Sequence, residues 1–509
     1  MLEQLWKAAR KPGAKGAVQG VAPVQRFTDK TDRRDEEATL GTQFVEGEKT
    51  RLLDRWLDKI VRASGSEIVF FGILAALLVW ALLGIRFGDT ENWQVIISDV
   101  QAILSYAFDS LLVRQQMNMY DREMVVAAQM QSRVHSHLRM FSQAQNELTQ
   151  EQKTVLLTYC SREETDENKL ALPSESKFGL FITAVSHILG HIALVALFWV
   201  AVFVWIGIGP MFQFSDSWQL YMNSASSAWM VLYFAFLANI RERHSFHGKI
   251  CLDALFEVDG SLEAHLRALT NDKESNSEVV LSAPKVNKLQ RAIFYYADFV
   301  GTLVGIAILL TVMIAWLATG PVFHFSANWW LFIGTYAGLV GMHDGFVLRN
   351  MQTRLTSYVE KEMEVLQQAD RIIFERTGLK FPESRADRRL TLSERVSVVV
   401  DKVSAHELTV LLGLLTIIGL LVGASAMKWT LTGQLLCNVP PSIIESFLMM
   451  ILVTGHNLVD DRKRLELQTL YERRVKLLGY AQKLKEIQIQ PMSAPDSKEP
   501  SLSVDATAP

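Results

Sequence analysis

The sequence predicts an all-α polytopic membrane protein, with about eight transmembrane helices forming four repeated helical hairpins that carry long cytoplasmic helical extensions. Apolar residues make up 49% of the 509 residues. They gather in blocks of about twenty with few charges, the length that crosses a hydrocarbon layer of about 30 Å. The blocks come in pairs, and a long charged segment separates each pair from the next. The formal net charge of −3 gives no general attraction to nucleic acid.

Each pair of apolar blocks is joined by a short connector. The odd-numbered blocks are aliphatic, whereas the even-numbered ones carry polar residues throughout. This asymmetry predicts that odd spans face lipid and even spans face a pore or a partner helix. The spans are expected at about 67–85, 94–113, 188–208, 219–240, 298–319, 329–348, 408–427 and 434–455.

Basic residues predict the orientation. The four connectors contain only Arg86 and Lys428, while Lys and Arg crowd the long segments beside the spans. The positive-inside rule therefore predicts cytoplasmic N- and C-termini. The first sixty residues are polar and basic without an early apolar run, so no cleavable signal peptide is expected.

These features divide the chain into hairpins and linkers. Amphipathic segments at 53–57 and 390–396 are expected at the membrane surface. Helices are expected to continue past the even spans, where Leu355, Leu366 and Ile373 lie on one helical stripe. The predicted division is a cytoplasmic segment 1–64, hairpin repeats with their helices at 65–150, 178–272, 291–378 and 401–490, cytoplasmic linkers 151–177, 273–290 and 379–400, and a disordered tail 491–509.

A ten-residue connector occurs twice. Residues 209–218 and 320–329 both read Gly-Pro-x-Phe-x-Phe-Ser-x-x-Trp, and Phe87 and Trp93 keep part of it in the first hairpin. Gly and Pro end a helix and favour a turn, and aromatic rings are favoured at the lipid–water boundary. The connector is therefore interpreted as structural. In the eighth span Pro440-Pro441 predicts an irregular first turn.

Polar residues on the even spans mark candidate functional positions. Intramembrane carboxylates are costly and therefore functional candidates, which favours Asp109, Asp344 and Glu445. Hydroxyl and amide side chains could instead hydrogen-bond between helices, and that alternative stays open. Aligned by repeat, the candidates form an outer ring of Ser98, Asn223 and Asn438 with Gly334 or Thr335. A deeper level holds Ser105, Met230, Gly341 or Met342, and Glu445, and a third holds Asp109 with Asp344 or Gly345 nearby; the register of the sixth span is open by one residue, and His343 is a further candidate ligand beside Asp344.

Other histidines and the cysteines give weaker signals. His187 and His191 are four residues apart, a spacing that could bind metal, but packing is the favoured interpretation because no third ligand follows. His135 and His137 are interpreted as surface residues. His456 and Gln116 are expected to be solvated at the inner mouth, and an exit site for the ion stays open as the alternative. Three cysteines without metal-ligand spacing predict single thiols.

The chain resembles the low-affinity iron permease family, particularly its fungal members. The resemblance rests on the repeated connector and on the Trp-Gln start of spans two and four. It also rests on the segments Leu111–Asn118 and Val453–Asn457. It implies low-affinity uptake of Fe²⁺ across the plasma membrane, with other divalent metals sharing the route and no bound cofactor.

Metal ligands must be argued from the residues themselves. Carboxylate and imidazole suit Fe²⁺, with Met342 as a softer neighbour and the ring of neutral oxygens replacing part of the hydration shell. Expected partners are the lipid bilayer and a divalent metal ion, not nucleic acid, and a homo-oligomer is left open. No enzyme motif is present in the sequence. The alternative function is a membrane scaffold or sensor acting through its cytoplasmic helices, whereas an anion channel is disfavoured because the spans lack internal Lys and Arg.

Overall fold

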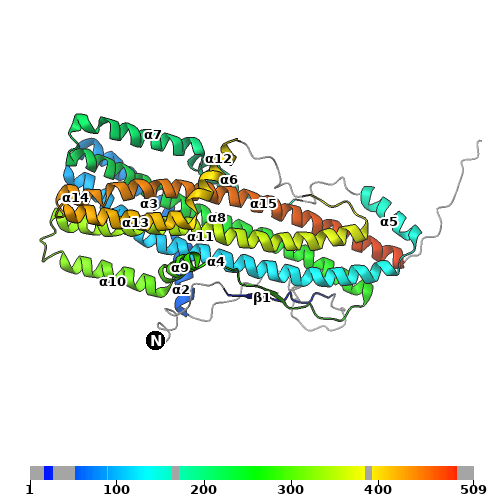
Figure 1. Cartoon of the computed structure of the whole chain (residues 1–509). Coiled ribbons are helices and arrows are strands. Elements are labelled where there is room, and N and C mark those ends of the chain that lie inside the picture. The colour runs from blue at the N-terminus through cyan, green and yellow to red at the C-terminus, as the bar shows by residue number, and fades with distance from the viewer. Residues whose placement is uncertain (1–15, 27–51, 89, 163–170, 384–391, 490–509) are drawn as a thin grey trace, which may run out of the picture.

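The computed structural model describes residues 16–26, 52–88, 90–162, 171–383 and 392–489, and these form an elongated helical molecule (Figure 1). The disordered tail predicted at 491–509 and much of the segment 1–64 lie outside the described residues. Four helices run through most of the length of the molecule. They are α4 (Glu91–Asn146), α8 (Asp216–Thr270), α11 (Ala327–Thr377) and α15 (Val439–Ile489).

These four long helices close a ring. The most extensive helix contacts in the molecule are α4 with α11, α8 with α15, α4 with α8, and α11 with α15. The order around the ring is therefore α4, α8, α15, α11. It follows that α4 and α15 are diagonal to each other, as are α8 and α11, so a contact across either diagonal lies at the central axis. The even-numbered spans predicted from the sequence supply all four members.

Four apolar helices lie outside the ring at one end. They are α3 (Glu67–Phe87), α7 (Ile192–Ile208), α10 (Leu303–Thr319) and α13 (Glu407–Ala426), and Figure 1 shows α7 and α10 on opposite edges. Only 6% of the apolar stretch of α3 and 17% of that of α7 are buried, against 78% for α15. Such exposed apolar surface suits contact with lipid rather than water. We call this end the apolar half.

A thirteen-residue helix precedes each apolar helix. The four are α2 (Leu52–Ser64), α6 (Lys177–Leu189), α9 (Lys288–Val300) and α12 (Leu392–Ser404). The chain breaks after each one, and Ser66, His191, Thr302 and His406 are the N-caps of the apolar helices that follow. The imidazoles of His191 and His406 accept hydrogen bonds from the backbone N–H two residues on. His191 is thus a capping residue.

Five helices of the described chain are long and apolar enough to cross a membrane, or six if the bent pair α9–α10 counts as one span. The helices α8 and α11 are not among these five. The molecule is accordingly an all-α membrane protein, while the number eight stays a prediction.

Three of the four connectors share one backbone conformation. Each contains two successive residues in the left-handed region, Gln213–Phe214, His324–Phe325 and Lys428–Trp429. In each, the second residue donates its N–H to a carbonyl five residues earlier, that of Gly209, Gly320 or Ala424. In the second hairpin this turn follows a short 3₁₀ helix η2 (Gly209–Phe212), which begins where the repeated motif places Gly and Pro.

Paired tryptophans lock three of the hairpins. Trp80 stacks on Trp93, Trp205 on Trp218 and Trp316 on Trp329, with ring centroids 4.3, 3.9 and 4.2 Å apart. In the first and third pairs each indole N–H donates to the backbone carbonyl of the other residue, at 3.0–3.3 Å. Stacked rings with satisfied N–H groups fix the two helices of a hairpin in register.

The fourth hairpin differs from the others in its second helix. A short helix α14 (Leu431–Leu436) precedes α15, and the chain breaks at Cys437 and Asn438. The break lies immediately before Pro440-Pro441, as the sequence predicts, because proline lacks the N–H that a continuous helix requires. Cys437 and Cys251 are buried free thiols, and the Cys160 side chain lies outside the described part of the chain.

We call the other end the distal half. It contains the helices beyond Gln116, Arg241, Gln352 and His456, together with α5 (Gln150–Arg162). Leu355, Leu366 and Ile373 are buried there, which confirms the predicted stripe. Of the two histidines interpreted as surface residues, His135 is exposed but His137 is fully buried. The interpretation of His137 was wrong because it considered the spacing on one helix and not the three helices packed around it.

A small sheet joins the N-terminal segment to the distal half. Strand β1 (Val18–Gly20) pairs antiparallel with β2 (Val279–Leu281), which adds two strands to a chain predicted to be all helical. The Ala22 N–H donates to the hydroxyl of Ser132 at 3.1 Å. A Cβ atom at Gly20 would lie 2.6 Å from the Cβ of Ala128, so glycine permits the strand to approach α4.

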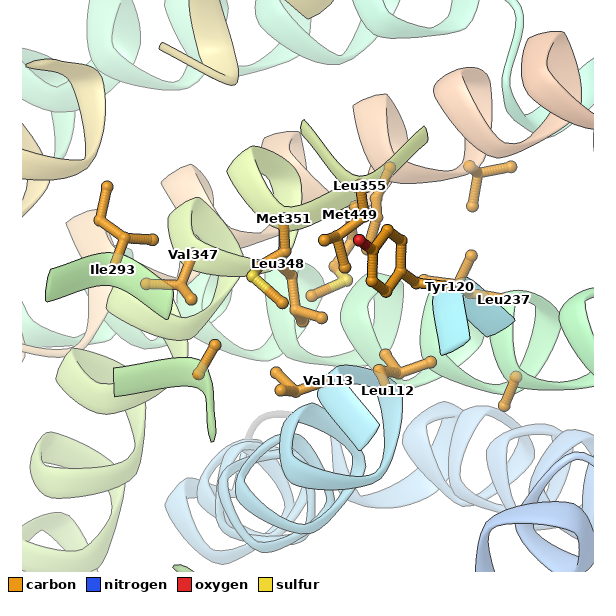
Figure 2. Close-up of a cluster of buried hydrophobic side chains, with 14 of the residues drawn as sticks. Leu112, Val113, Tyr120, Leu237, Ile293, Val347, Leu348, Met351, Leu355 and Met449 are labelled. Carbon is orange, nitrogen blue, oxygen red and sulfur yellow. The ribbon is translucent and has the colours of Figure 1, made fainter. Parts of the chain in front are cut away.

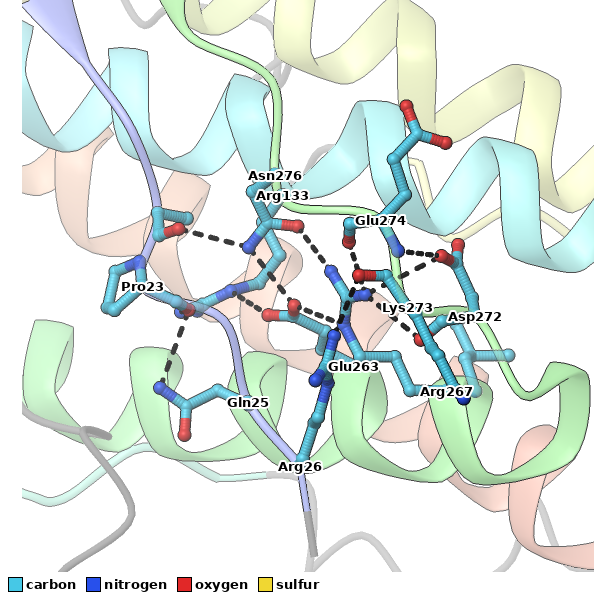
Figure 3. A network of polar contacts seen from close by, with 12 residues as sticks. Pro23, Gln25, Arg26, Arg133, Glu263, Arg267, Asp272, Lys273, Glu274 and Asn276 are labelled. Atoms are coloured by element: carbon cyan, nitrogen blue, oxygen red, sulfur yellow. Dashed lines mark hydrogen bonds and ion pairs between the residues drawn. The ribbon is translucent and has the colours of Figure 1, made fainter.

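Buried ion pairs join the four long helices in the distal half. Arg133 binds Asp259 at 3.1 Å and Glu263 at 3.0 Å, and Arg267 binds the other oxygen of Glu263 at 2.8 Å. Figure 3 shows the part of this network that meets Pro23, Gln25 and Arg26 of the N-terminal segment. Arg474 of α15 completes it, contacting Asp259 and also Asp370 of α11, each at 2.7 Å.

Candidate functional site

The outer level of the ring is made of neutral polar groups. The Asn438 amide, at the break before α15, donates to the Thr335 hydroxyl of α11 at 3.1 Å. Gly334 of α11 also faces it, since a Cβ there would lie 3.1 Å from Asn438 Oδ1. Ser98 and Asn223 are buried on α4 and α8, and the Ser98 hydroxyl donates to the carbonyl of Val95 in its own helix.

Serines and a glutamine form the next level. The Ser227 hydroxyl of α8 donates to Gln101 Oε1 of α4 at 3.3 Å, and Gln101 Nε2 donates to the Ser105 hydroxyl at 2.5 Å. The hydroxyls of Ser226 and Ser442 join α8 to α15 at 2.8 Å. These bonds support the sequence alternative that hydroxyl and amide groups link neighbouring helices.

Two carboxylates face each other across the axis below this level. Asp109 of α4 and Glu445 of α15 belong to diagonal helices, are both 0% exposed, and interact electrostatically. Ser105 lies beside Glu445. In the described part of the molecule, none of the four carboxylate oxygens has a partner in hydrogen-bonding geometry. Two buried acids with no nearby cation among the described residues, and with the Ser105 hydroxyl as the one donor beside Glu445, are costly in a folded protein, which points to a function other than stability.

A glycine makes room for the Glu445 carboxylate. A Cβ at Gly341 of α11 would lie 2.6 Å from Glu445 Oε1 and 3.0 Å from Oε2. Any larger residue would displace the carboxylate from the axis. The close approach also fixes the register of α11, which the sequence left uncertain by one residue: Gly334 and Gly341 face Asn438 and Glu445, and Thr335 bonds Asn438 beside them.

Asp344 belongs to the same cluster but faces outward. Its Oδ1 accepts a hydrogen bond of 2.6 Å from Tyr296 of α9, and the Tyr296 ring packs against His343 at 4.7 Å. Met342 is fully buried on α11. The third carboxylate therefore approaches Asp109 from the interface of α4, α9 and α11. The half-buried His343 lies on the side of α9, not on the axis.

Four leucines, one from each long helix, form the next buried level inward. Leu112, Leu237, Leu348 and Leu452 each follow the Ser105, Met230, Gly341 and Glu445 level by seven residues, and all are at most 2% exposed. They belong to one buried cluster, in which Figure 2 shows Leu112, Leu237 and Leu348 near Met351 and Met449. We call these four residues the leucine ring. It separates the carboxylates from the distal half by an apolar layer.

A polar layer follows four residues beyond the leucine ring. It contains Gln116, Arg241, Gln352 and His456, one residue from each long helix. The sequence placed Gln116 and His456 in solvent at the inner mouth, but they are only 7% and 5% exposed. His456 is buried because its Nε2 lies 3.1 Å from Nδ1 of His244, which also contacts Asp460 at 3.1 Å.

A cavity of about 300 Å³ opens beyond this polar layer. Gln116, Gln352 and His456 line its inner wall, together with Met119, His244 and Cys251. The order along the axis is therefore neutral oxygens, carboxylates, leucines, the polar layer and the cavity.

The described side chains do not form a ready coordination sphere. Within the described ranges, no group of three or more His, Cys, Asp or Glu is arranged to hold a metal ion. His187 and His191 are accounted for differently, since His187 contacts Asp461 at 3.6 Å while His191 caps α7. Any cation at the carboxylate level would thus meet Asp109 and Glu445 with few other charged ligands.

Reasoning from the sequence did not identify some residues of this region. Tyr296, which donates to Asp344, lies on the amphipathic segment before the third apolar helix, where a tyrosine is unremarkable. Tyr106 was also missed, although its position on an even span was the available signal. Its hydroxyl lies 3.1 Å from that of Tyr336, a polar residue of the sixth span that the sequence did offer, and the two join α4 to α11 beside the carboxylates. Arg241 was counted only as a basic residue marking the inner end of a span.

The fold and this axis define an all-α membrane protein whose central ring of helices carries buried polar and acidic side chains. Comparison with known proteins places it more closely. The model of a family described as low affinity iron permease matches residues 178–296, 289–376 and 393–497. The chain belongs to this low-affinity iron permease family, whose members are metal-ion transport proteins.

Two yeast proteins are similar along most of the chain. The low-affinity iron/zinc ion transport protein fet4 of Schizosaccharomyces pombe is 32% identical over 499 residues, which cover 93% of this chain and 85% of that protein. The low-affinity Fe(2+) transport protein of Saccharomyces cerevisiae is 33% identical over 460 residues, covering 84% and 83%. No solved structure matches the chain.

Proposed function

We propose that this chain carries divalent metal ions, Fe²⁺ foremost, into the cytoplasm at low affinity. The ions follow the axis enclosed by α4, α8, α11 and α15. The similarity to yeast proteins named for iron and for iron/zinc transport supports both the substrate class and modest selectivity. The inside-negative membrane potential favours entry by about 2.3 kcal/mol per charge per 100 mV.

The observation that carries the proposal is the pair Asp109 and Glu445. Both carboxylates are fully buried on diagonal helices, and neither forms an ion pair with a cationic side chain of the described chain. A divalent cation passing between them supplies the missing positive charge. Because few other charged ligands surround the pair, the ion is held weakly and can leave, as conduction requires.

The neutral levels serve the ion before it reaches the acids. Asn438, Thr335 and the hydroxyls of Ser105, Ser226 and Ser442 offer oxygen atoms that replace part of its hydration shell. Ser98 and Asn223 belong to this level in the proposal. Asp344, with His343 and Met342 on the same helix, adds charge from the side of α9 and attracts cations over anions.

We infer that eight helices cross the plasma membrane as four hairpins, with both termini in the cytoplasm. Support comes from the four-fold succession of amphipathic helix, apolar helix, connector and long helix. The recurring left-handed connector and the three tryptophan pairs support it further. In this arrangement α8 and α11 cross the membrane as members of the ring, and their polar residues face the other helices of the ring and not the lipid.

The test is uptake of radiolabelled Fe²⁺ by cells expressing the chain or an Asp109→Asn, Glu445→Gln double variant at equal surface level. We expect the variant to lose at least about tenfold in uptake, because the ion then crosses the same region without a counter-charge. The matched control is Asp121→Asn, Glu486→Gln, which makes the same changes at exposed positions of the same two helices.

The outcomes separate the candidate functions. Uptake that is lost only in the first variant supports the proposal. Equal uptake in both variants removes the carboxylates from the path. If the chain itself gives no uptake above untransfected cells, the scaffold or sensor function takes precedence, acting through the distal half.

A further inference from the structure

A buried guanidinium crosses the axis on the inner side of the leucine ring. Arg241 of α8 is 0% exposed, and its Nη2 donates to Gln352 Oε1 of α11 at 3.5 Å. Because α8 and α11 are diagonal, this contact reaches across the centre of the ring. Arg241 therefore occupies the line that joins the carboxylates to the distal cavity.

The charge of Arg241 is not neutralised within the described chain. Its Nε and Nη1 have no hydrogen-bond partner there, and no acidic side chain of the described residues forms an ion pair with it. Arg349 of α11 lies beside it, since its Nη1 donates to the same Gln352 oxygen at 3.0 Å, but Arg349 also forms an ion pair with Asp401 and Arg241 does not. Burying an unpaired charge is costly, so its retention on this axis calls for a function.

The leucine ring lies directly before Arg241. An apolar constriction of four leucines excludes water and with it a hydrated ion. A fixed positive charge immediately beyond it repels a cation that has shed part of its hydration. The two layers thus oppose the same movement by different physical means, and both are in place in this conformation.

We propose that the leucine ring and Arg241 form the inner gate of the path, so that the conformation described is closed and opening must move the Arg241 guanidinium off the axis. The inference rests on the proposed function, because a gate requires an ion path. It assigns Arg241 as a positioning residue that sets when metal passes, whereas the carboxylates determine whether it passes.

The geometry predicts whether each mutation raises or lowers the barrier to the ion. Removing the charge with Arg241→Gln lowers the barrier, while Arg241→Lys keeps the charge. Making the constriction polar with Leu348→Ser lets water into the leucine ring. Adding a positive charge to the same layer with Gln116→Lys raises the barrier, and Gln116→Leu serves as its uncharged control.

The experiment is flux of radiolabelled Fe²⁺ into liposomes containing the full chain, with and without an inside-negative potential. Arg241→Gln and Leu348→Ser should each raise the flux at zero potential by at least about threefold. Arg241→Lys should stay within about twofold of the parent, and Gln116→Lys should fall below Gln116→Leu. Arg243→Gln is the matched control, since Arg243 lies two residues further on α8 and pairs with Glu67 near the surface.

The results distinguish the gate from the proposed function. An increase in either variant, in liposomes that still retain a co-trapped anionic dye, supports the gate, because leakage through misfolded protein would release the dye as well. Equal flux in Arg241→Gln, Leu348→Ser and the parent overturns it, as does an equal increase in Arg243→Gln. Should Arg241→Gln fail to fold, the comparison of Gln116→Lys with Gln116→Leu decides. A parent chain that carries no Fe²⁺ above empty liposomes rejects the proposed function itself.

Discussion

The two halves of the molecule bury charged side chains in opposite ways. In the distal half, Arg133, Asp259 and Arg474 contact one another at 2.7–3.1 Å, so each buried charge has its complement. On the axis of the apolar half, Asp109, Glu445 and Arg241 are as deeply buried, but none of them forms an ion pair with another described residue, and Arg241 has only its Nη2 bond to Gln352. Paired charges fix how helices pack, whereas unpaired ones leave room for an ion to take part.

The largest effect should come from breaking the paired network. Arg474→Met leaves Asp259 and Asp370 buried without their shared cation, which should cost about 3–5 kcal/mol of folding stability. Arg462→Met removes an arginine of the same helix that is 49% exposed, and should cost less than about 1 kcal/mol. Thermal unfolding of the purified proteins in detergent measures both. In contrast, Asp109→Asn should leave the folding stability unchanged or raise it. A loss of stability equal to that of Arg474→Met would contradict the difference between the two halves.

A second prediction concerns what holds the apolar half together without ion pairs. Trp316→Ala removes a buried ring and its hydrogen bond to the carbonyl of Trp329, and should cost about 3 kcal/mol. Trp316→Phe keeps a ring but loses the N–H, and should cost about 1 kcal/mol. The same unfolding assay ranks the three proteins. Equal stability of all three would mean that the tryptophan pairs do not hold the hairpins.

The third prediction is a pH effect confined to the distal half. Burial lowers the pKa of His137 from 6.5 to about 3, and its Nδ1 lies 3.9 Å from Asp259. A base with a lowered pKa in the folded state binds its proton only on unfolding, so stability is full above pH 6.5 and falls as the pH drops toward 3. At pH 5 the loss should be about 2 kcal/mol.

The measurement for His137 is the unfolding temperature at pH 7.5 and pH 5. His137→Gln should show a smaller drop between these two values than the parent chain, since glutamine has no proton to gain. His135→Gln changes an exposed histidine of the same helix and should not differ from the parent. An identical pH dependence in all three proteins would contradict the assignment.

The smallest effect should separate Asp344 from the axial pair. Tyr296→Phe removes the donor to Asp344 and should change stability by about 1 kcal/mol, with Fe²⁺ uptake altered less than about tenfold. Loss of uptake as complete as in the Asp109→Asn, Glu445→Gln variant would instead move Asp344 and Tyr296 into the centre of the path.

Much of this architecture follows from patterns that repeat along the chain. The apolar blocks predict α3, α7, α10 and α13 within a few residues, and the proline pair predicts the break before α15. The axial position of Asp109 and Glu445 also follows, because their helical stripes place them on the inner faces of even spans.

Other features depend on contacts between distant segments. The burial of His137 and the docking of β1 come from helices and strands far apart in sequence. Arg241 lies where a basic residue ordinarily marks the end of a span, so only its contact with a diagonal helix reveals its place. The leucine ring cannot be identified from the sequence for a different reason. Leucine is frequent in every span, and these four leucines are distinguished only by lying at the same level of the four helices.

The measurement that tests the central claim most directly is the reactivity of a cysteine introduced at Ser105, beside Glu445. In a background with Cys160, Cys251 and Cys437 replaced by serine, Ser105→Cys should react with a small water-soluble cationic thiol reagent, and added Fe²⁺ should slow the reaction. Val100→Cys is the control, because Val100 is 44% exposed on the outer face of the same helix and should react only with lipid-soluble reagents. If Ser105→Cys also reacts only with lipid-soluble reagents and Fe²⁺ does not protect it, the axial path between Asp109 and Glu445 is contradicted.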